Sequence, residues 1–261
     1  MNKLLNYYTI AKTGNITILG ITLMDISILK QAKTFALDTL FPKICFGCKK
    51  EGFFLCKGCF DALNSQIEVQ KCPVCSYRNF SGILCQVCRK NSDLTRLLFC
   101  HDYKNAVVRE LIHAFKYGFL RELADPLSVF LINMVKKNKI RLQKTILVVP
   151  IPLHSAKLRK RGLNQSELLA KNFAGYFRLN MIADNLTRNK NTEPQIEMSN
   201  FKKRRENITG AFEVLRPEEF KNKKIILVDD VSTSRSTLEE AAKVLKGAGA
   251  KSIWGMVVAR G

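Results

Sequence analysis

The sequence has no uninterrupted apolar run of the roughly 18 residues that a membrane-spanning helix needs. An apolar stretch at residues 16–24 has the size of a signal-peptide core, but no small-residue cleavage pattern follows it. The sequence also has no low-complexity tract, and its only internal repeat is a recurring cysteine pair. We therefore expect a cytoplasmic protein with no transmembrane segment.

Acidic residues are scarce, with 22 Asp and Glu against 43 Lys and Arg, which gives a net charge of +21. Such a charge favours polyanionic partners such as nucleic acid, phosphate-rich ligands or anionic lipid. The alternative is a lysine-rich proteome with no special partner. The 3 histidines form no recognisable nucleophile–base triad. A hydrophobic fraction of 46% over 261 residues excludes a disordered chain and suffices for one large or two small domains.

Eight of the 9 cysteines form four C-x-x-C pairs, separated by gaps of 7, 12 and 9 residues. Two such pairs can supply the four thiolates of a tetrahedral zinc site. A disulfide framework does not explain one repeated spacing, and a thioredoxin-like motif uses one pair only. The pattern predicts two structural zinc ions, held by Cys45, Cys48, Cys56, Cys59, Cys72, Cys75, Cys85 and Cys88.

The pairing of the zinc ligands has two alternatives. Sequential pairing gives two small zinc ribbons, and interleaved pairing gives a cross-braced module. The short spacers favour sequential pairing, because each can close a hairpin. Four sulfur ligands leave no open position for catalysis, so zinc is expected to stabilise the module.

The chain divides into an N-terminal extension (1–36), a double zinc ribbon module (37–92) and an α/β domain (93–261). Met24 is an alternative start, which would remove residues 1–23. Helical spacing extends over 26–41 and ends before Pro42. In the last part, strands are predicted at 94–103, 145–152, 179–188, 211–215, 223–231 and 252–260, and helices at 104–118, 121–137, 164–177 and 236–247. This alternation predicts a mostly parallel sheet with helices on both faces.

The segment Ile225–Thr237 (IILVDDVSTSRST) carries the most chemical information. A buried strand ends in Asp229 and Asp230, and a loop rich in small hydroxyl residues leads into a helix. Backbone N–H groups and the helix dipole suit a phosphate, whereas two carboxylates suit vicinal sugar hydroxyls beside a hydrated divalent cation. The alternative, a capped helix after an ordinary strand, leaves the adjacent acids unexplained. The pattern predicts a sugar phosphate as ligand.

The same segment resembles the 5-phosphoribosyl 1-pyrophosphate (PRPP) signature of type I phosphoribosyltransferases. Other pieces resemble the ComF family in the same order along the chain, and the resemblance covers about residues 37–261. These pieces are LDTLFPKICFGC before the zinc module, AFKYG, VVPIPLHSAKLRKRGLNQSELLA, and LTRNKNTEPQIEMSNFKKRRENITGAFEV.

The resemblance implies a zinc module joined to a phosphoribosyltransferase-type fold that binds PRPP with Mg²⁺. It also implies a role in DNA uptake and natural transformation, in contact with single-stranded DNA on the cytoplasmic side and with the uptake machinery as a further partner. Asp229 and Asp230 would contact the ribose and be the catalytic pair. The phosphate loop would comprise Val231, Ser232, Thr233, Ser234, Arg235, Ser236 and Thr237. The pyrophosphate loop and a mobile hood would comprise Arg161, Gly162, Asn164, Gln165, Arg188, Thr192, Gln195, Arg205 and Asn207.

One position departs from the family pattern, because Arg235 stands where the loop usually has glycine. Either its side chain lies outside the site, or it fills the phosphate pocket, or its guanidinium pairs with the phosphate. Three functions therefore remain open: a PRPP-binding protein of DNA uptake, an active phosphoribosyltransferase acting on a small nucleophile, and a degenerate scaffold.

Three basic clusters carry much of the excess charge. We interpret Lys136–Lys144 as a solvated face. For Lys157–Arg161 and Lys202–Arg205, a solvated face and a DNA-binding groove are equally supported, and Phe201 is a candidate for base stacking.

Overall fold

The computed structural model describes residues 42–77, 79, 81–118, 120–191 and 208–261, and two short paired strands, β1 (Thr17–Ile18) and β2 (Ile21–Thr22). The helix predicted at 26–41 and the basic cluster at 202–205 lie outside the described residues, as do Thr192, Gln195, Phe201, Arg205 and Asn207. Among the described helices, none has the length and apolarity needed to cross a bilayer.

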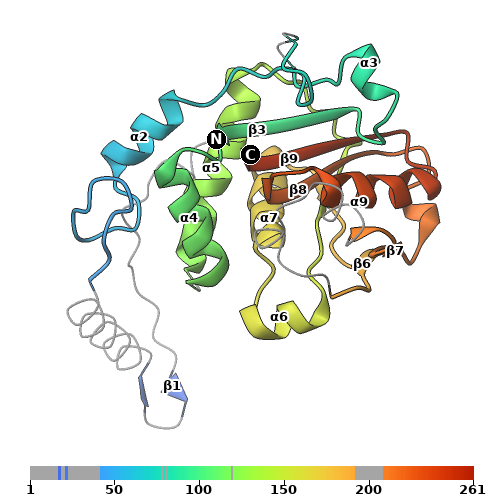
Figure 1. Ribbon diagram of the computed structural model, residues 1–261. Coiled ribbons are helices and arrows are strands. Elements are labelled where there is room, and N and C mark those ends of the chain that lie inside the picture. Colours follow the sequence, from blue (N-terminus) through green and yellow to red (C-terminus); the bar gives the residue numbers. More distant parts are fainter. Residues whose placement is uncertain are drawn as a thin grey trace. The chain divides into compact units, whose positions relative to one another are not determined.

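The central element is a five-stranded sheet of order β3-β9-β8-β4-β5 (Figure 1). Its strands are β3 (Arg96–Asp102), β9 (Ser252–Arg260), β8 (Lys224–Ser232), β4 (Leu147–Pro150) and β5 (Asn180–Met181). Every pairing in it is parallel, so all the carboxyl ends lie at one edge. A second, antiparallel pair joins β6 (Leu186–Arg188) to β7 (Phe212–Val214). The predicted mostly parallel α/β fold is confirmed.

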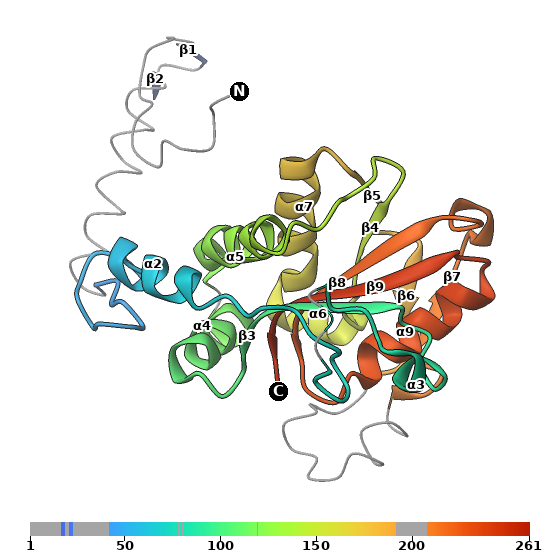
Figure 2. The same ribbon diagram turned by 90° about the horizontal axis from the view of Figure 1, so that it is seen from above.

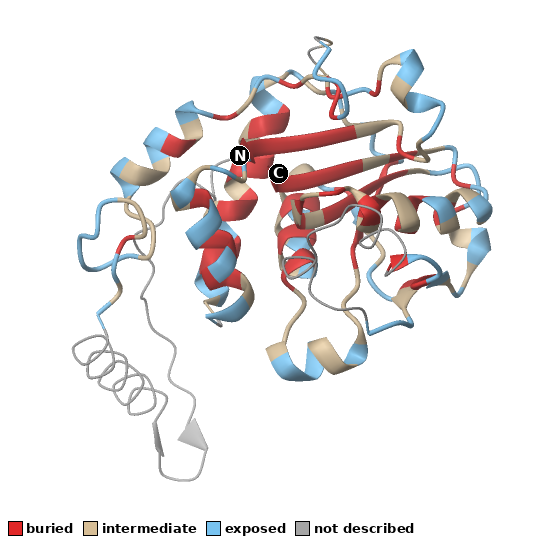
Figure 3. Cartoon of the chain, in the orientation of Figure 1, coloured by how far each residue is buried: buried red, intermediate tan, exposed pale blue. Residues whose placement is uncertain are grey.

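Helices cover both faces of the sheet (Figure 2). On one face lie α5 (Ala124–Lys137) and α7 (Gln165–Phe177), and on the other lie α9 (Ser236–Gly247) and the β6–β7 pair. The helix α4 (Ala106–Tyr117) follows β3, and a 3-10 turn, η1 (Arg121–Leu123), precedes α5. The long strands are buried over most of their length (Figure 3), which explains their continuous apolar, β-branched sequences.

The structure differs from the predicted elements in two places. The single strand expected at 179–188 is two short strands in different sheets. The chain turns between them at Asn185, whose buried side chain accepts hydrogen bonds from the Leu215 and Arg216 backbone N–H groups. The helix α6 (Ser155–Arg161) was not expected, because its basic sequence lacks an apolar stripe. His154 caps its N-terminus, because His154 Nδ1 accepts a hydrogen bond from Ala156 N–H.

The second half of the cysteine-rich segment packs along the exposed edge of β3. Glu68 N–H donates to Cys100 O, and the buried Gln70 side chain exchanges two hydrogen bonds with the Phe99 backbone. Further along, Leu97 N–H donates to the carbonyl of Gly82, where an added Cβ would lie 2.7 Å from Leu97 O. These contacts pair the edge strand, which would otherwise offer free backbone groups.

Candidate functional site

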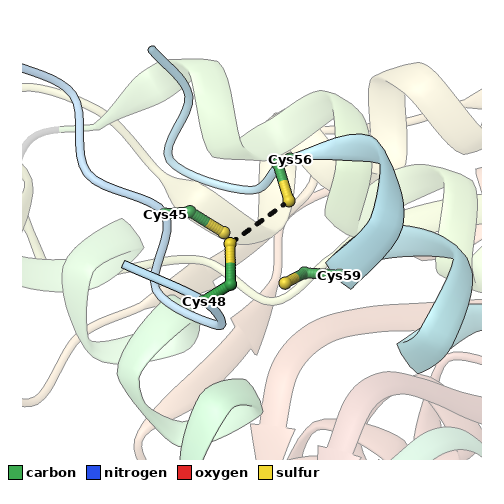
Figure 4. A group of neighbouring side chains, drawn as sticks. All are labelled: Cys45, Cys48, Cys56 and Cys59. Carbon is green, nitrogen blue, oxygen red and sulfur yellow. Dashed lines mark hydrogen bonds between the residues drawn. The ribbon is translucent and has the colours of Figure 1, made fainter. Parts of the chain in front are cut away.

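The eight paired cysteines form two separate clusters, and each cluster takes two consecutive C-x-x-C pairs. In each, the four Sγ atoms lie within 4.8 Å of one another. Figure 4 shows the first cluster, where Cys48 Sγ lies 3.6 Å from Cys56 Sγ. The same separation joins Cys75 Sγ and Cys85 Sγ in the second. The grouping is the sequential one that the short spacers favour.

Both clusters are built in the same way. The first pair lies in a tight turn in which the residue after the second cysteine has a positive φ, 61° at both Lys49 and Ser76. The second pair lies at the start of a helix, α2 (Lys57–Ser65) after Cys56 and α3 (Gln86–Arg89) after Cys85. A helix N-terminus stabilises a thiolate, the form of cysteine that binds metal.

The geometry fits zinc. Tetrahedral Zn–S bonds of about 2.3 Å separate the sulfur atoms by about 3.8 Å, close to the observed sulfur distances. Burial raises the pKa of the Cys72 thiol, but the backbone N–H groups of Cys75, Cys85 and Val74 outweigh it and lower that pKa to about 6. Cys100 is buried in β3, belongs to neither cluster, and burial raises the pKa of its thiol. Each four-cysteine group could hold a structural zinc ion.

A cavity of about 330 Å³ opens at the carboxyl edge of the sheet. Its walls come from the ends of β4 and β8, the last turn of α4, the helix α6, the start of α7 and the first turn of α9. This is the edge at which open α/β sheets bind ligands. The sequence-predicted residues that line it are Arg161, Gln165, Arg188, Asp229, Asp230, Val231, Thr233 and Thr237.

A buried ion pair lies at the base of this cavity. Lys116 Nζ is 2.8 Å from Asp230 Oδ1, and their side chains are 17% and 5% exposed. Burial lowers the pKa of Lys116, but the carboxylates of Asp230 and Asp229 outweigh it, so that pKa is raised. Lys116 therefore stays charged and neutralises part of the carboxylate pair.

Asp229 has a different environment from Asp230. Its Oδ1 accepts hydrogen bonds from the Ser166 hydroxyl at 2.8 Å and from Asp230 N–H at 2.9 Å. Burial and the neighbouring Asp230 carboxylate raise the pKa of Asp229 to about 6, against the opposing effects of Lys116 and Ser166. Both aspartates thus bring carboxyl oxygens, which accept hydrogen bonds, to the cavity.

The start of α7 holds this arrangement in place. The buried Gln165 side chain donates to the carbonyls of Phe115 and Lys116 at 3.1 and 3.4 Å, which ties α7 to the last turn of α4. Asn164 does not line the cavity; its side chain accepts from Ser166 N–H and donates to Ile151 O. Gly162, also outside the lining, ends α6 with a φ of 69°.

The loop after β8 has a left-handed backbone at the position where the sequence departs from the family pattern. Arg235 has a φ of 63°, the left-handed conformation that glycine adopts most easily. Its Nη1 lies 3.8 Å from Glu239 Oε1, and Arg235 is not among the residues that line the cavity. Glu239 is itself held by hydrogen bonds from Ser92 Oγ and Asp93 N–H. Of the three alternatives for Arg235, the structure favours a side chain outside the site.

Three other predicted loop residues are buried beside the cavity rather than lining it. The hydroxyl oxygens of Ser234 and Ser236 lie 3.0 Å apart, and Ser232 accepts a backbone hydrogen bond from Gly261. Thr233 and Thr237 are the hydroxyl residues of the loop that reach the lining.

Four further cations line the cavity besides Lys116: Lys157, Lys160, Arg161 and Arg188. Burial, and then the charges of Arg188, Arg161 and Lys116, lower the pKa of Lys157 to about 8. The Arg161 guanidinium stacks 4.9 Å from the Tyr117 ring centroid, which fixes its position. The cavity therefore suits a ligand with several negative charges and neighbouring hydroxyls.

Sequence reasoning missed three groups that matter here: Lys116, Ser166 and Tyr117. It placed Lys157 in a basic cluster for which a solvated face and a DNA-binding groove are equally supported. Lys116 and Tyr117 lie within the AFKYG motif, which was recognised but given no role in the site. No periodicity or spacing pairs Lys116 with Asp230, because 113 positions separate them and only the fold brings them together.

The two clusters predict a metal content of two zinc ions per chain. Replacing Cys48 or Cys75 by serine should lower it to about one, because a tetrahedral site loses most of its affinity with one thiolate. Cys100→Ser is the matched control and should retain both ions. Elemental analysis of purified protein measures the content, and an unchanged zinc content in Cys48→Ser and Cys75→Ser would contradict the assignment.

Comparison with known proteins agrees with this geometry. Residues 158–261 match the phosphoribosyl transferase domain, a segment that includes both aspartates and the loop after β8. Competence protein F of Haemophilus influenzae is 27% identical over 213 residues, 77% of this chain and 89% of that protein. The DNA utilization protein YhgH of Escherichia coli K12 is 28% identical over 223 residues, 82% of this chain and 96% of that protein. The resemblance drawn from the motifs is confirmed: the chain carries a phosphoribosyl transferase domain and is a homologue of Competence protein F and of the DNA utilization protein YhgH.

Proposed function

We propose that this protein binds PRPP with Mg²⁺ in the cavity at the carboxyl edge of the sheet, and that it acts in DNA uptake, handling single-stranded DNA on the cytoplasmic side. The observation that carries the first part is that Asp229 and Asp230 line one cavity together with several cations, beside a phosphate-type loop. The names of its relatives, Competence protein F and DNA utilization protein YhgH, support the second part.

Each part of PRPP has a matching group. The loop from Val231 to Thr237 and the N-terminus of α9 suit the 5-phosphate, because backbone N–H groups and the helix dipole favour an anion. Asp229 and Asp230 suit the vicinal ribose hydroxyls and would hold Mg²⁺, which neutralises charge on the pyrophosphate when bound. Lys157, Lys160, Arg161 and Arg188 suit the pyrophosphate itself.

A second candidate function is transfer of the ribosyl phosphate to a small nucleophile. The position of Arg235 beside Glu239, away from the cavity, favours it over a degenerate scaffold. In this reaction the bond from ribose C1 to pyrophosphate breaks as the nucleophile attacks. The chain's residues would bind both ends of PRPP and stabilise the oxocarbenium-like state. Release of pyrophosphate that depends on Asp229 and Asp230 would distinguish transfer from binding alone.

The single-stranded DNA part is supported by the net charge of +21 and by the exposed cations of α6, Arg159 and Lys160. Lys160 also lines the cavity, so a strand crossing α6 would pass beside the PRPP site. The hood residues Thr192, Gln195, Arg205 and Asn207 stay a prediction from the resemblance.

Calorimetric titration of zinc-loaded protein with Mg²⁺–PRPP tests the ligand. We expect micromolar binding, and a loss of at least about tenfold in Asp229→Asn, because hydrogen bonds to a charged acceptor contribute roughly 1.5–3 kcal/mol. Asp230→Asn should lose as much, with a lower unfolding temperature because Lys116 is left unpaired. Arg235→Gly is the control and should bind at least as well. Absence of heat at millimolar ligand would overturn the proposal.

The depressed pKa of Lys157 predicts a pH dependence. Because this pKa is lowered to about 8, the side chain loses its charge when the pH rises through that value. Lys157→Arg keeps the charge. The affinity of the wild type for Mg²⁺–pyrophosphate relative to this variant should therefore fall by up to about tenfold from one unit below to one unit above pH 8. The ratio cancels the titration of the ligand itself, and a ratio independent of pH would contradict a phosphate contact by Lys157.

Binding to single-stranded DNA should weaken steeply with salt, because each neutralised phosphate releases counterions. Fluorescence anisotropy of a labelled oligothymidylate over a range of salt concentrations measures the slope. Absent or salt-insensitive binding would remove the DNA part of the proposal and leave PRPP binding untouched.

A further inference from the structure

A second cavity, of about 320 Å³, opens at the opposite edge of the same sheet. The residues at the amino ends of β3, β8 and β9 line it, together with the segment that joins α5 to β4. Lys224 in this cavity and Asp230 in the first one stand six residues apart on β8, about 20 Å along an extended strand. The two cavities are therefore separate, and a ligand in one leaves the other open.

Arg96 and Trp254 both line this second cavity. They are register partners on the neighbouring parallel strands β3 and β9, and the guanidinium carbon of Arg96 lies 4.1 Å from the Trp254 ring centroid. Arg96 Nε is buried and has no hydrogen-bond partner in the described part of the chain. Burial lowers the pKa of Arg96. A buried cationic donor without an acceptor is unfavourable, and an anion bound beside it would supply the acceptor.

Three further cations lie around the cavity, Lys139, Arg141 and Lys224. Lys224 Nζ donates to the neutral Gln143 side chain, and no carboxylate is among the residues that line this cavity. In the first cavity, by contrast, two aspartates balance part of the positive charge. The second cavity therefore combines an uncompensated positive charge with an aromatic ring and the partly exposed side chain of Ile140.

We propose that the cavity formed by Arg96, Trp254, Lys139, Arg141 and Lys224 binds a nucleotide unit of single-stranded DNA. The phosphate would pair with the cations, and the base would lie against the Trp254–Arg96 stack and the Ile140 side chain. Cations that follow a backbone beside an aromatic surface are the usual composition of single-strand sites. This inference rests on the DNA part of the proposed function and assigns that part a place remote from the PRPP cavity.

Binding at this cavity can be followed by tryptophan fluorescence, because Trp254 is the single tryptophan of the sequence. The full-length zinc-loaded protein is titrated with an oligothymidylate of about 10 nucleotides, a length within the range of single-strand sites. Tryptophan emission is excited selectively, and anisotropy of the labelled oligonucleotide is recorded in parallel. We expect a saturable change of Trp254 emission with the same midpoint as the anisotropy.

The test variant is Lys139→Gln/Arg141→Gln, which removes two exposed charges of this cavity and leaves Arg96 and Trp254 in place. Its affinity for the oligonucleotide should fall on the order of tenfold. Its salt slope should decrease by about 1.4, at roughly 0.7 per phosphate contact on a single strand. The matched control is Lys171→Gln/Lys243→Gln, which removes the same charge from exposed positions that line neither cavity. It should behave as the wild type, and both variants should bind Mg²⁺–PRPP equally.

Four outcomes decide the matter. Loss of affinity in the test variant alone, with a Trp254 response in the wild type, supports the assignment. Equal affinity in the two variants, or DNA binding with unchanged Trp254 emission, overturns this site while DNA handling by the protein stands. Absence of any DNA binding overturns this inference together with the DNA part of the proposed function. Thymidine monophosphate that saturates the Trp254 response at the same concentration as the oligonucleotide would overturn a DNA strand as ligand and assign the site to free nucleotides.

Discussion

The parallel pairing of β8 with β9 on one side and β4 on the other is the constraint on which both cavities depend. Because all strands of this sheet run in one direction, their carboxyl ends and amino ends meet at opposite edges. Asp229 and Asp230 therefore line one cavity together with residues of α4, α6 and α7 at the carboxyl edge. Lys224 lines the other cavity with Arg96 and Trp254 at the amino edge. An antiparallel sheet of the same strands would mix the two sets. The carboxyl edge is where open α/β sheets bind ligands, and Asp229 and Asp230 there lie within the segment that matches the phosphoribosyl transferase domain.

Electrostatics distinguishes the two edges. At the carboxyl edge, Lys116 compensates Asp230 at 2.8 Å, and the remaining cations line the same cavity as the Asp229–Asp230 pair. A ligand with both hydroxyls and phosphates fits such a divided surface. At the amino edge, no lining carboxylate balances the cations, so the charge alone selects an anion. The net charge of +21 is thus distributed unevenly over the two cavities. The balance of charges within each cavity says more about its ligand than the total does.

The two four-cysteine clusters and Arg235 each require a positive φ at a residue other than glycine, and the chain accommodates it in different ways. Each cysteine cluster repeats one design, a turn with a positive φ followed by a helix N-terminus, so one short motif used twice places eight sulfur atoms. Arg235 instead holds a left-handed backbone without the freedom of glycine, a conformation that costs about 1–2 kcal/mol. Its guanidinium forms an ion pair with Glu239, which accepts hydrogen bonds from Ser92 and Asp93. The strain persists because the surrounding helix and strand fix the loop at both ends.

The sequence by itself determined the features that arise within short segments. The C-x-x-C spacing predicted both four-cysteine groups, and the apolar run 223–231 predicted β8. Asp229–Asp230 before a hydroxyl-rich loop predicted a ligand site at the edge of the sheet where the structure has a cavity. Tertiary structure decided what joins distant segments: the pairing of Lys116 with Asp230, the side of the loop on which Arg235 lies, and the stacking of Arg96 on Trp254. The split of the strand expected at 179–188 belongs to the same class, because Asn185 bonds to backbone groups 30 residues further along the chain. Local patterns fix backbone conformation through sterics and hydrogen bonds over a few residues, whereas partners across the fold are selected only when the sheet closes and buries them.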